Sequence, residues 1–149
     1  MLTNPPKLDL RSDAGLASAL RVSLARLTRR LRRQAAAHSL TPTQFATLAA
    51  VERHPGISPG ELAELEKVQP PSMTRVIGAL EERGLVARTP HPTDRRQVTV
   101  SVTAQGEALL KEERRLKEAW LTQRLKELTP EERAVLRQAA PILEKLSKI

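Results

Sequence analysis

The hydrophobic residues in the first part of the chain recur with helical spacing. Between residues 14 and 37, leucines stand three or four positions apart, which places them on one face of a helix. Two shorter stretches, one after Thr41 and one after Ser58, have apolar residues at the same spacing, and in the second Leu62 and Leu65 are expected to face inward. This part of the chain is therefore predicted to form one long helix and two shorter ones.

Capping boxes mark three of the predicted helix starts. In a capping box, a hydroxyl residue and a Glu or Gln three positions later satisfy each other's free backbone amides. The sequence contains TPTQ at 41–44, SPGE at 58–61 and TPEE at 129–132. Each has proline at the first helical position, where a missing N–H costs nothing. Helices are predicted to begin at all three places.

The segment from residue 69 to residue 102 combines a helix with two strands. The helix is predicted from about Gln69 to Arg83, followed by Gly84 as the left-handed residue that closes it. One apolar stripe runs along it: Met73, Val76, Ile77 and Leu80. Strands are predicted at 85–89 and 98–102, and the second alternates apolar with polar residues. Its alternating valines are Val98, Val100 and Val102.

The rest of the pattern consists of a hairpin tip and two further helices. The connection PHPTDRRQ at 90–97 contains two prolines, which stiffen the tip of a β-hairpin. Thr103 is expected to cap a long helix with apolar rows, and a last helix is predicted from Thr129 toward Ile149.

These elements predict a mostly α protein with a small β-hairpin wing. Residues 41–102 are expected to form a winged helix-turn-helix lobe, in which the second helix of the pair enters the major groove of DNA. Residues 14–40 and 103–149 are expected to form a helical dimerisation region, and residues 1–13 a disordered N-terminal arm. Two helices joined by a short turn are common in helical proteins, so the hairpin with its basic tip is the more specific signal.

Charge narrows the class of partner. Among 149 residues, 25 are Lys or Arg and 17 are Asp or Glu, which gives a net charge of +8 and a pI near 10.8. Such a protein is suited to polyanions, either nucleic acid or an anionic membrane surface. Only Phe45 and Trp120 are aromatic, which disfavours both single-strand stacking and a membrane-surface helix. With no apolar run of membrane length and no signal-like start, a cytoplasmic protein without a membrane partner is expected.

The sequence gives little indication of a metal site or a catalytic site. The chain has no cysteine, and His38, His54 and His91 are scattered without a ligand motif, so no metal site is expected. No nucleophile elbow or glycine-rich phosphate loop is present. Carboxylates occur mainly among Lys and Arg on helix faces, as in KEERRLKE at 111–118. We therefore expect no enzyme, no catalytic residue and no cofactor.

The stretch QPPSMTRVIGALEERGLVART followed by DRRQVTVSVTAQG resembles the MarR (multiple antibiotic resistance regulator) family. The resemblance rests on an Asp-x-Arg wing tip that leads through a strand into a Thr-x-x-Gly helix start. It covers residues 14–149 in the order of elements and is densest at 62–106. One departure is the turn LEKVQ, where many members have a glycine.

The resemblance implies a homodimeric, sequence-specific regulator of transcription that binds double-stranded DNA, usually a repressor. Five residues are expected at the major-groove surface: Gln69, Pro71, Ser72, Thr74 and Arg75. The fork of Arg75 would suit the O6/N7 edge of guanine. In the wing, Asp94 would orient the tip, Arg95 would contact a phosphate and Arg96 would enter the minor groove.

Dimerisation and ligand binding follow from the same resemblance. Apolar rows on the first and the last two helices exceed what a small lobe could bury, and an isologous interface would cover them. The residues expected there are Leu16, Leu20, Leu24, Leu121, Leu125, Leu136, Leu143 and Leu146. A symmetric dimer predicts a pseudo-palindromic operator. Release by a small aromatic or anionic ligand is a further expectation, with no assigned pocket.

Two rival functions remain at this point. A winged helix can be a protein–protein interaction module, whose basic faces would contact an acidic partner. A zinc-responsive regulator is the other, because some relatives of the family bind zinc. Salt dependence of duplex binding would separate the first rival, and sensitivity to chelators the second.

Overall fold

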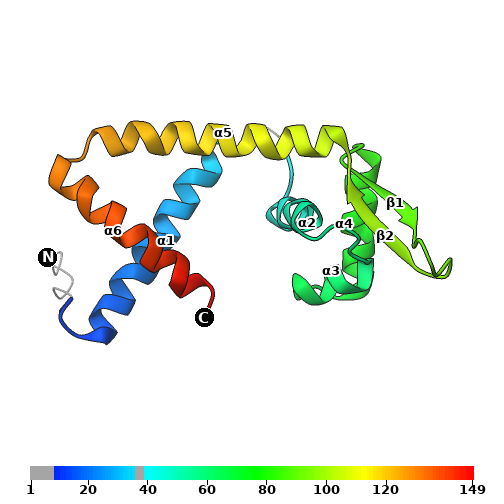
Figure 1. Cartoon of the computed structure of the whole chain (residues 1–149), viewed down its shortest axis with the longest axis horizontal. Coiled ribbons are helices and arrows are strands. Elements are labelled where there is room, and N and C mark those ends of the chain that lie inside the picture. Colours follow the sequence, from blue (N-terminus) through cyan, green and yellow to red (C-terminus); the bar gives the residue numbers. More distant parts are fainter. Residues whose placement is uncertain (1–8, 36–38) are drawn as a thin grey trace, which may run out of the picture. The chain divides into compact units, whose positions relative to one another are not determined.

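The computed structural model describes residues 9–35 and 39–149 (Figure 1). It forms two compact units, Met1–Ala35 with Leu116–Ile149, and Ala36–Arg115. The elements in chain order are α1 (Asp13–Arg33), α2 (Pro42–Arg53), α3 (Pro59–Leu65), α4 (Pro70–Glu82), β1 (Val86–Pro90), β2 (Val98–Val102), α5 (Ala104–Lys126) and α6 (Pro130–Ser147). The predicted class, mostly α with a two-stranded hairpin, is confirmed.

The helix starts follow the local chemistry of the chain. All three predicted capping boxes are present, at Thr41, Ser58 and Thr129, with both reciprocal hydrogen bonds formed in each. At Thr41, for example, the backbone N donates to Gln44 Oε1 at 3.0 Å, and Gln44 N donates to Thr41 Oγ1 at 3.1 Å. These short-range contacts fix the first turns of α2, α3 and α6.

Helix α1 begins one residue before the predicted start. Ser12 caps it by accepting a hydrogen bond from Gly15 N at 3.0 Å, and the helix ends at Arg33 instead of continuing to residue 37. Gln34 and Ala35 lie in a turn, and residues 36–38 are outside the described residues. The expected disordered arm covers residues 1–13, and residues 1–8 of it also lie outside the described residues. Asp9 is described, and its backbone O accepts a hydrogen bond from Ser12 N at 3.3 Å.

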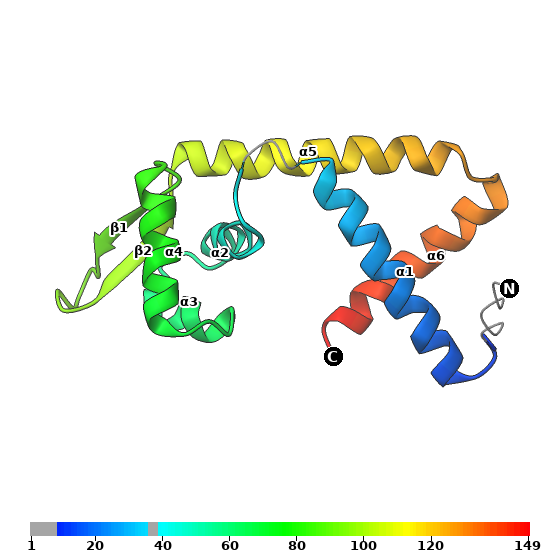
Figure 2. The ribbon, with the colours of Figure 1, turned by 180° about the vertical axis from the view of Figure 1, so that it is seen from behind.

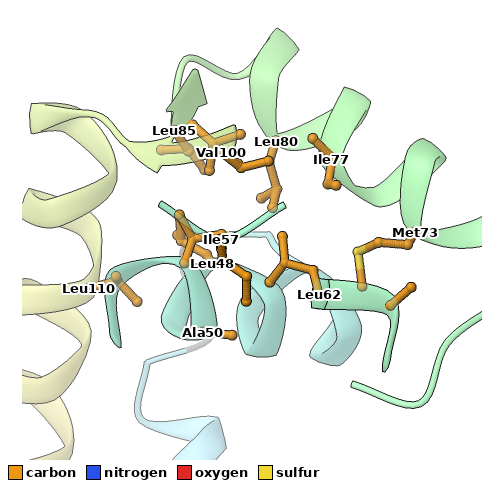
Figure 3. Close-up of a cluster of buried hydrophobic side chains, with 13 residues drawn as sticks. Leu48, Ala50, Ile57, Leu62, Met73, Ile77, Leu80, Leu85, Val100 and Leu110 are labelled. Atoms are coloured by element: carbon orange, nitrogen blue, oxygen red, sulfur yellow. The ribbon is translucent and has the colours of Figure 1, made fainter. Parts of the chain in front are cut away.

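The unit Ala36–Arg115 has a continuous hydrophobic core. Figure 3 shows side chains from its helices and from β2 pointing toward one another. The buried residues are Leu48, Ala50, Val51, Ile57, Leu62, Ala63, Met73, Ile77, Leu80, Leu85, Val86, Val100 and Leu110. Leu65 does not belong to it: the prediction that it faces inward is wrong, because it is 46% exposed and Ala63 occupies the core side of α3 instead.

The hairpin is antiparallel and attached to the lobe along β2. Its pairing runs from Val86 opposite Val102 to Pro90 opposite Val98. On the other side of β2, Val100 N donates to Ile57 O at 2.8 Å, so the segment between α2 and α3 is bonded to the strand. The hairpin lies beside α4 and its connecting loop protrudes from the lobe (Figures 1 and 2).

The Thr-x-x-Gly sequence holds the start of α5 against the end of α4. Thr103 Oγ1 donates to Gly84 O at 2.6 Å and accepts from Gly106 N at 3.1 Å, while Thr103 N donates to Leu85 O at 3.0 Å. A Cβ atom on Gly106 would overlap the carbonyl oxygen of Leu85. Glycine at this position therefore allows the close approach of the two backbones.

The other unit contains α1, the C-terminal part of α5 and α6, and its described residues form no such core. Both α1 and α6 are described in full, and neither contains a buried residue. The guanidinium of Arg30 on α1 lies over the Trp120 ring of α5, 5.0 Å from its centroid. Arg133 donates to Leu125 O at 3.4 Å and to Leu128 O at 3.3 Å, which satisfies carbonyls at the end of α5.

Candidate DNA-binding surface

Helix α4 presents one polar face outward. Its inner face is taken by Met73, Ile77 and Leu80, which are all buried. Of the five residues predicted to contact the major groove, four are exposed and Ser72 is half-buried. The exposed four are Gln69, Pro71, Thr74 and Arg75. The structure thus brings the predicted contact residues together on the first two turns of one helix.

The start of α4 is unusual in its backbone donors. A helix normally offers four free N–H groups at its N-terminus, but Pro70 and Pro71 occupy the first two positions and have none. Gln69 is the N-cap and its side chain makes no capping hydrogen bond. Hydrogen-bond donors at this end of α4 must therefore come mainly from side chains, and the Gln69 amide can supply one.

The side chain of Thr74 forms a hydrogen bond within its own helix. Its hydroxyl donates to Pro70 O at 3.0 Å, so the hydroxyl proton is not free for a base. What Thr74 can offer outward is its methyl group and the lone pairs of Oγ1. Both suit thymine-methyl or donor contacts in the major groove.

The turn between α3 and α4 adopts a regular helix-ending geometry without a glycine. Val68 N donates to Ala63 O at 2.9 Å and Lys67 N to Glu64 O at 3.3 Å, the bonding of a Schellman motif. Lys67 takes the left-handed position of that motif, with φ at 52°. The missing glycine noted in LEKVQ is therefore replaced by a lysine, which sequence reasoning did not single out.

The tip of the wing is a tight hydrogen-bonded turn. Asp94 Oδ1 accepts from Arg96 N at 3.0 Å, and Asp94 O accepts from Gln97 N at 3.0 Å. His91 N in turn donates to Gln97 O at 3.0 Å, which closes the loop at the end of the strands. The side chains of Arg95 and Arg96 are exposed. Asp94 thus bonds within the wing, while the roles of all three residues toward DNA remain predictions.

Unpaired positive charge gathers on these two parts of the lobe. Arg75, Arg95 and Arg96 make no ion pair with any residue in the described part of the chain. At the opposite end of α4, by contrast, Arg88 of β1 lies 3.6 Å from Glu81 and neutralises it. A polyanion that approaches α4 and the wing tip would meet exposed cations there.

The described residues offer neither a metal site nor a membrane span. Within residues 9–35 and 39–149, no three or more His, Cys, Asp and Glu side chains gather into a possible metal site. His38 is outside the described residues. Within the same residues, no helix combines the length and the apolar character that a membrane span requires.

Comparison with known proteins decides the family. The MarR family model matches residues 40–98, the helix pair and most of the wing. An HTH-type transcriptional regulator of Mycobacterium tuberculosis is 44% identical over 134 residues, which cover 90% of this chain and 94% of that protein. The chain belongs to the MarR family.

One further relative and one solved structure agree with this placement. The HTH-type transcriptional repressor MdtR of Bacillus subtilis is 34% identical over 109 residues, covering 73% of this chain and 68% of MdtR. The crystal structure of wild-type MarR from E. coli, in its apo form, matches with a TM-score of 0.69 and 30% identity over 88% of this chain and 96% of MarR. This MarR-family chain is thus a helix-turn-helix regulator of transcription, and α3, α4 and the hairpin form its winged helix-turn-helix fold.

Proposed function

We propose that this MarR-family regulator is a homodimeric repressor that binds a specific, pseudo-palindromic duplex. The observation that carries the proposal is a set of exposed cations, Arg75, Arg95 and Arg96, which one lobe presents on α4 and on the hairpin tip and which make no ion pair with a described residue. A helix and an adjoining wing are the two parts with which winged helices contact neighbouring grooves.

Base recognition is assigned to α4. The major groove distinguishes all four base pairs by their donors and acceptors, and an arginine fork fits guanine O6 and N7. Arg75 is the one cation on the first two turns of α4, and Gln69 offers an amide that pairs with adenine N6 and N7 in the same way. Because Pro70 and Pro71 supply no amide donors, these side chains carry the readout.

The wing is assigned to the neighbouring minor groove and backbone. A narrow minor groove has a strongly negative potential that attracts an inserted arginine. Arg96 is the candidate for this contact, since the hydrogen bond from its backbone N to Asp94 fixes its position in the turn. Arg95 is assigned to a phosphate, a contact that adds affinity without reading sequence.

Dimerisation is inferred from the uncovered apolar faces of α1 and α6. Predicted interface residues Leu16, Leu24, Leu136 and Leu146 are all more than 40% exposed in the single chain. Leu20, Leu121, Leu125 and Leu143 are half-buried. A second copy would bury both faces through an isologous contact, and two symmetric lobes would read two half-sites about one helical turn apart.

The experiment that tests the proposal is selection of bound duplexes from random DNA by the purified full chain, followed by titration of the best duplex and a scrambled one. Sedimentation should give a dimer, and Arg75→Ala should reduce the preference for the selected duplex. Arg137→Ala is the matched control, because Arg137 of α6 is also exposed and makes no ion pair with a described residue. A stable monomer, or equal affinity for every base order, would contradict the proposal.

Release by a small aromatic or anionic ligand is the finer part of the proposal. It is supported by Arg30 and Arg124, whose guanidiniums lie 5.0 Å and 5.8 Å from the Trp120 centroid and combine positive charge with an aromatic face. A ligand that prefers a dimer with altered spacing of the α4 helices must weaken DNA binding by its differential affinity. Phenolic acids should quench Trp120 fluorescence and release the duplex; no response across the series would remove this class of ligand.

A further inference from the structure

His91 organises the backbone of the wing tip. Its Nδ1 accepts hydrogen bonds from Asp94 N at 3.2 Å and from Thr93 N at 3.3 Å, and Thr93 Oγ1 also lies 3.3 Å from it. The side chain is half-buried at the end of β1, and it reaches over the turn that leads to Arg96. Asp94, whose amide it holds, also bonds the amide of Arg96 through Oδ1.

The two amide contacts require an unprotonated Nδ1. A backbone amide can only donate, so a nitrogen that receives two amides must keep its lone pair. A protonated Nδ1 could not accept from Thr93 or Asp94, and the Thr93 hydroxyl would be its only partner among these three contacts. The arrangement therefore requires the neutral tautomer that carries its proton on Nε2, and imidazolium loses it.

We propose that His91 is a positioning residue for DNA binding, and that it sets the wing tip only while Nδ1 is unprotonated. This rests on the proposed function of the wing. The chain of contacts runs from Nδ1 to the Asp94 amide, and from the Asp94 carboxylate to the Arg96 amide. A wing tip that is already ordered loses less conformational entropy on binding than a mobile one. His91 would therefore raise the affinity for DNA without contacting it.

The charges near the ring act in both directions. In the wing tip they are Asp94, Arg95 and Arg96, and on β1, three residues before His91, Arg88, which pairs with Glu81 at 3.6 Å. Imidazolium would add one positive charge, which favours DNA, and would break the two amide contacts, which disfavours binding. The loss of the two amide contacts is expected to dominate, because imidazolium adds only one charge to a tip that already carries Arg95 and Arg96.

The experiment compares His91→Asn and His91→Ala with the wild-type chain. Asparagine places an amide oxygen near the position of Nδ1 and does not titrate, whereas alanine removes the acceptor. At about pH 8, His91→Asn should bind the selected duplex within about twofold of wild type, and His91→Ala about three- to tenfold more weakly, the typical loss for a missing cap. At about pH 5.5, wild type should fall toward the alanine variant while the asparagine variant keeps its affinity.

Controls separate this proposal from that of the wing itself. His54→Asn is the matched control, because His54 also lies in the lobe and its side chain makes no contact with the wing tip in the described residues; it should leave the pH profile unchanged. If Arg96→Ala has no effect, the assignment of the wing is wrong. If Arg96→Ala weakens binding but wild type and His91→Asn share one pH profile, or His91→Ala equals wild type at both pH values, the positioning role of His91 is overturned.

Discussion

Replacing Gly106 by alanine tests how closely α5 must approach the lobe. Helix propensity alone favours the change, because glycine inside a helix is about 1 kcal/mol less stable than alanine. The structure opposes it: a Cβ on Gly106 would overlap Leu85 O and lie 2.7 Å from Val102 Cγ2. The nearest atom belongs to the backbone, so no side-chain rotation can relieve the overlap.

The magnitude follows from what must move. Overpacking typically costs about 1–3 kcal/mol, and α5 can shift only by straining the bonds of Thr103 to Gly84 and Leu85, a cap that is worth about 1 kcal/mol. After the gain in propensity is subtracted, Gly106→Ala should lower the free energy of unfolding by about 1–3 kcal/mol. The loss should appear as a lower urea midpoint with an unchanged slope.

Gly78 of α4 provides the matched control. A Cβ there would meet no atom within 4 Å, so Gly78→Ala should raise the free energy of unfolding by about 0.5–1 kcal/mol. Gly106→Ala and Gly78→Ala are the same substitution in two helices of one chain. They differ in that only Gly106 lies close to another backbone segment. If Gly106→Ala were as stable as wild type, the close contact between Gly106 and Leu85 could not be a requirement of the fold.

Three further perturbations follow from the same contacts. Arg96→Ala should weaken binding of the selected duplex by about 1–3 kcal/mol at fixed salt, and an unchanged Kd in fluorescence anisotropy would refute the wing role. Lys67→Gly should stabilise the lobe by about 1 kcal/mol, because it relieves a left-handed residue; a lower midpoint on urea titration would contradict this. Arg115 lowers the pKa of Glu112, first through a hydrogen bond and then by Coulombic attraction, so the stability it adds is present at neutral pH and lost as pH falls through that pKa. In an NMR titration Arg115→Gln should raise the pKa of Glu112, and an unmoved titration would count against the pair.

The sequence was most informative where the chemistry is local. The capping boxes at Thr41, Ser58 and Thr129 depend on residues three positions apart, so they could be predicted without knowledge of packing. The apolar stripe of α4 was equally clear, because thirteen residues give the helical period enough repeats to define a face. The direction of that stripe then determined which side chains could be offered to DNA.

Prediction was weaker at the ends of elements. Leu65 continues the spacing from Leu62, but α3 ends there and the left-handed Lys67 turns the chain, so Val68 packs on the core instead. Alternation places Val98 on the face of Val100, yet Val98 is 38% exposed because it pairs with Pro90 at the far end of the hairpin. Periodicity identifies a face but not how far the core extends along it.

The site residues that sequence reasoning missed have no compositional signal. Lys67 holds a position where glycine or asparagine would have been the recognisable residue. The spacing of histidines tests only for a metal site, so it could not indicate that His91 accepts hydrogen bonds from amides two and three residues later. Its nearness to the Asp-x-Arg tip was the one available hint, since side chains that bond their own loop lie within a few residues of it.

The two parts of the surface imply a division between specificity and affinity. Pro70 and Pro71 remove amide donors from the start of α4, so in the proposed complex binding there would depend on side chains that match particular bases. The wing tip instead carries two guanidiniums on a backbone that hydrogen bonds preset, an arrangement suited to groove shape and phosphate. Substitution of Arg75 should therefore change which duplex is preferred. Substitution of Arg95 should weaken binding to all duplexes alike, and it should reduce the slope of log K against log salt concentration by about one, the loss of one phosphate contact. A selectivity change from Arg95 and a uniform loss from Arg75 would reverse the assignment of the two parts.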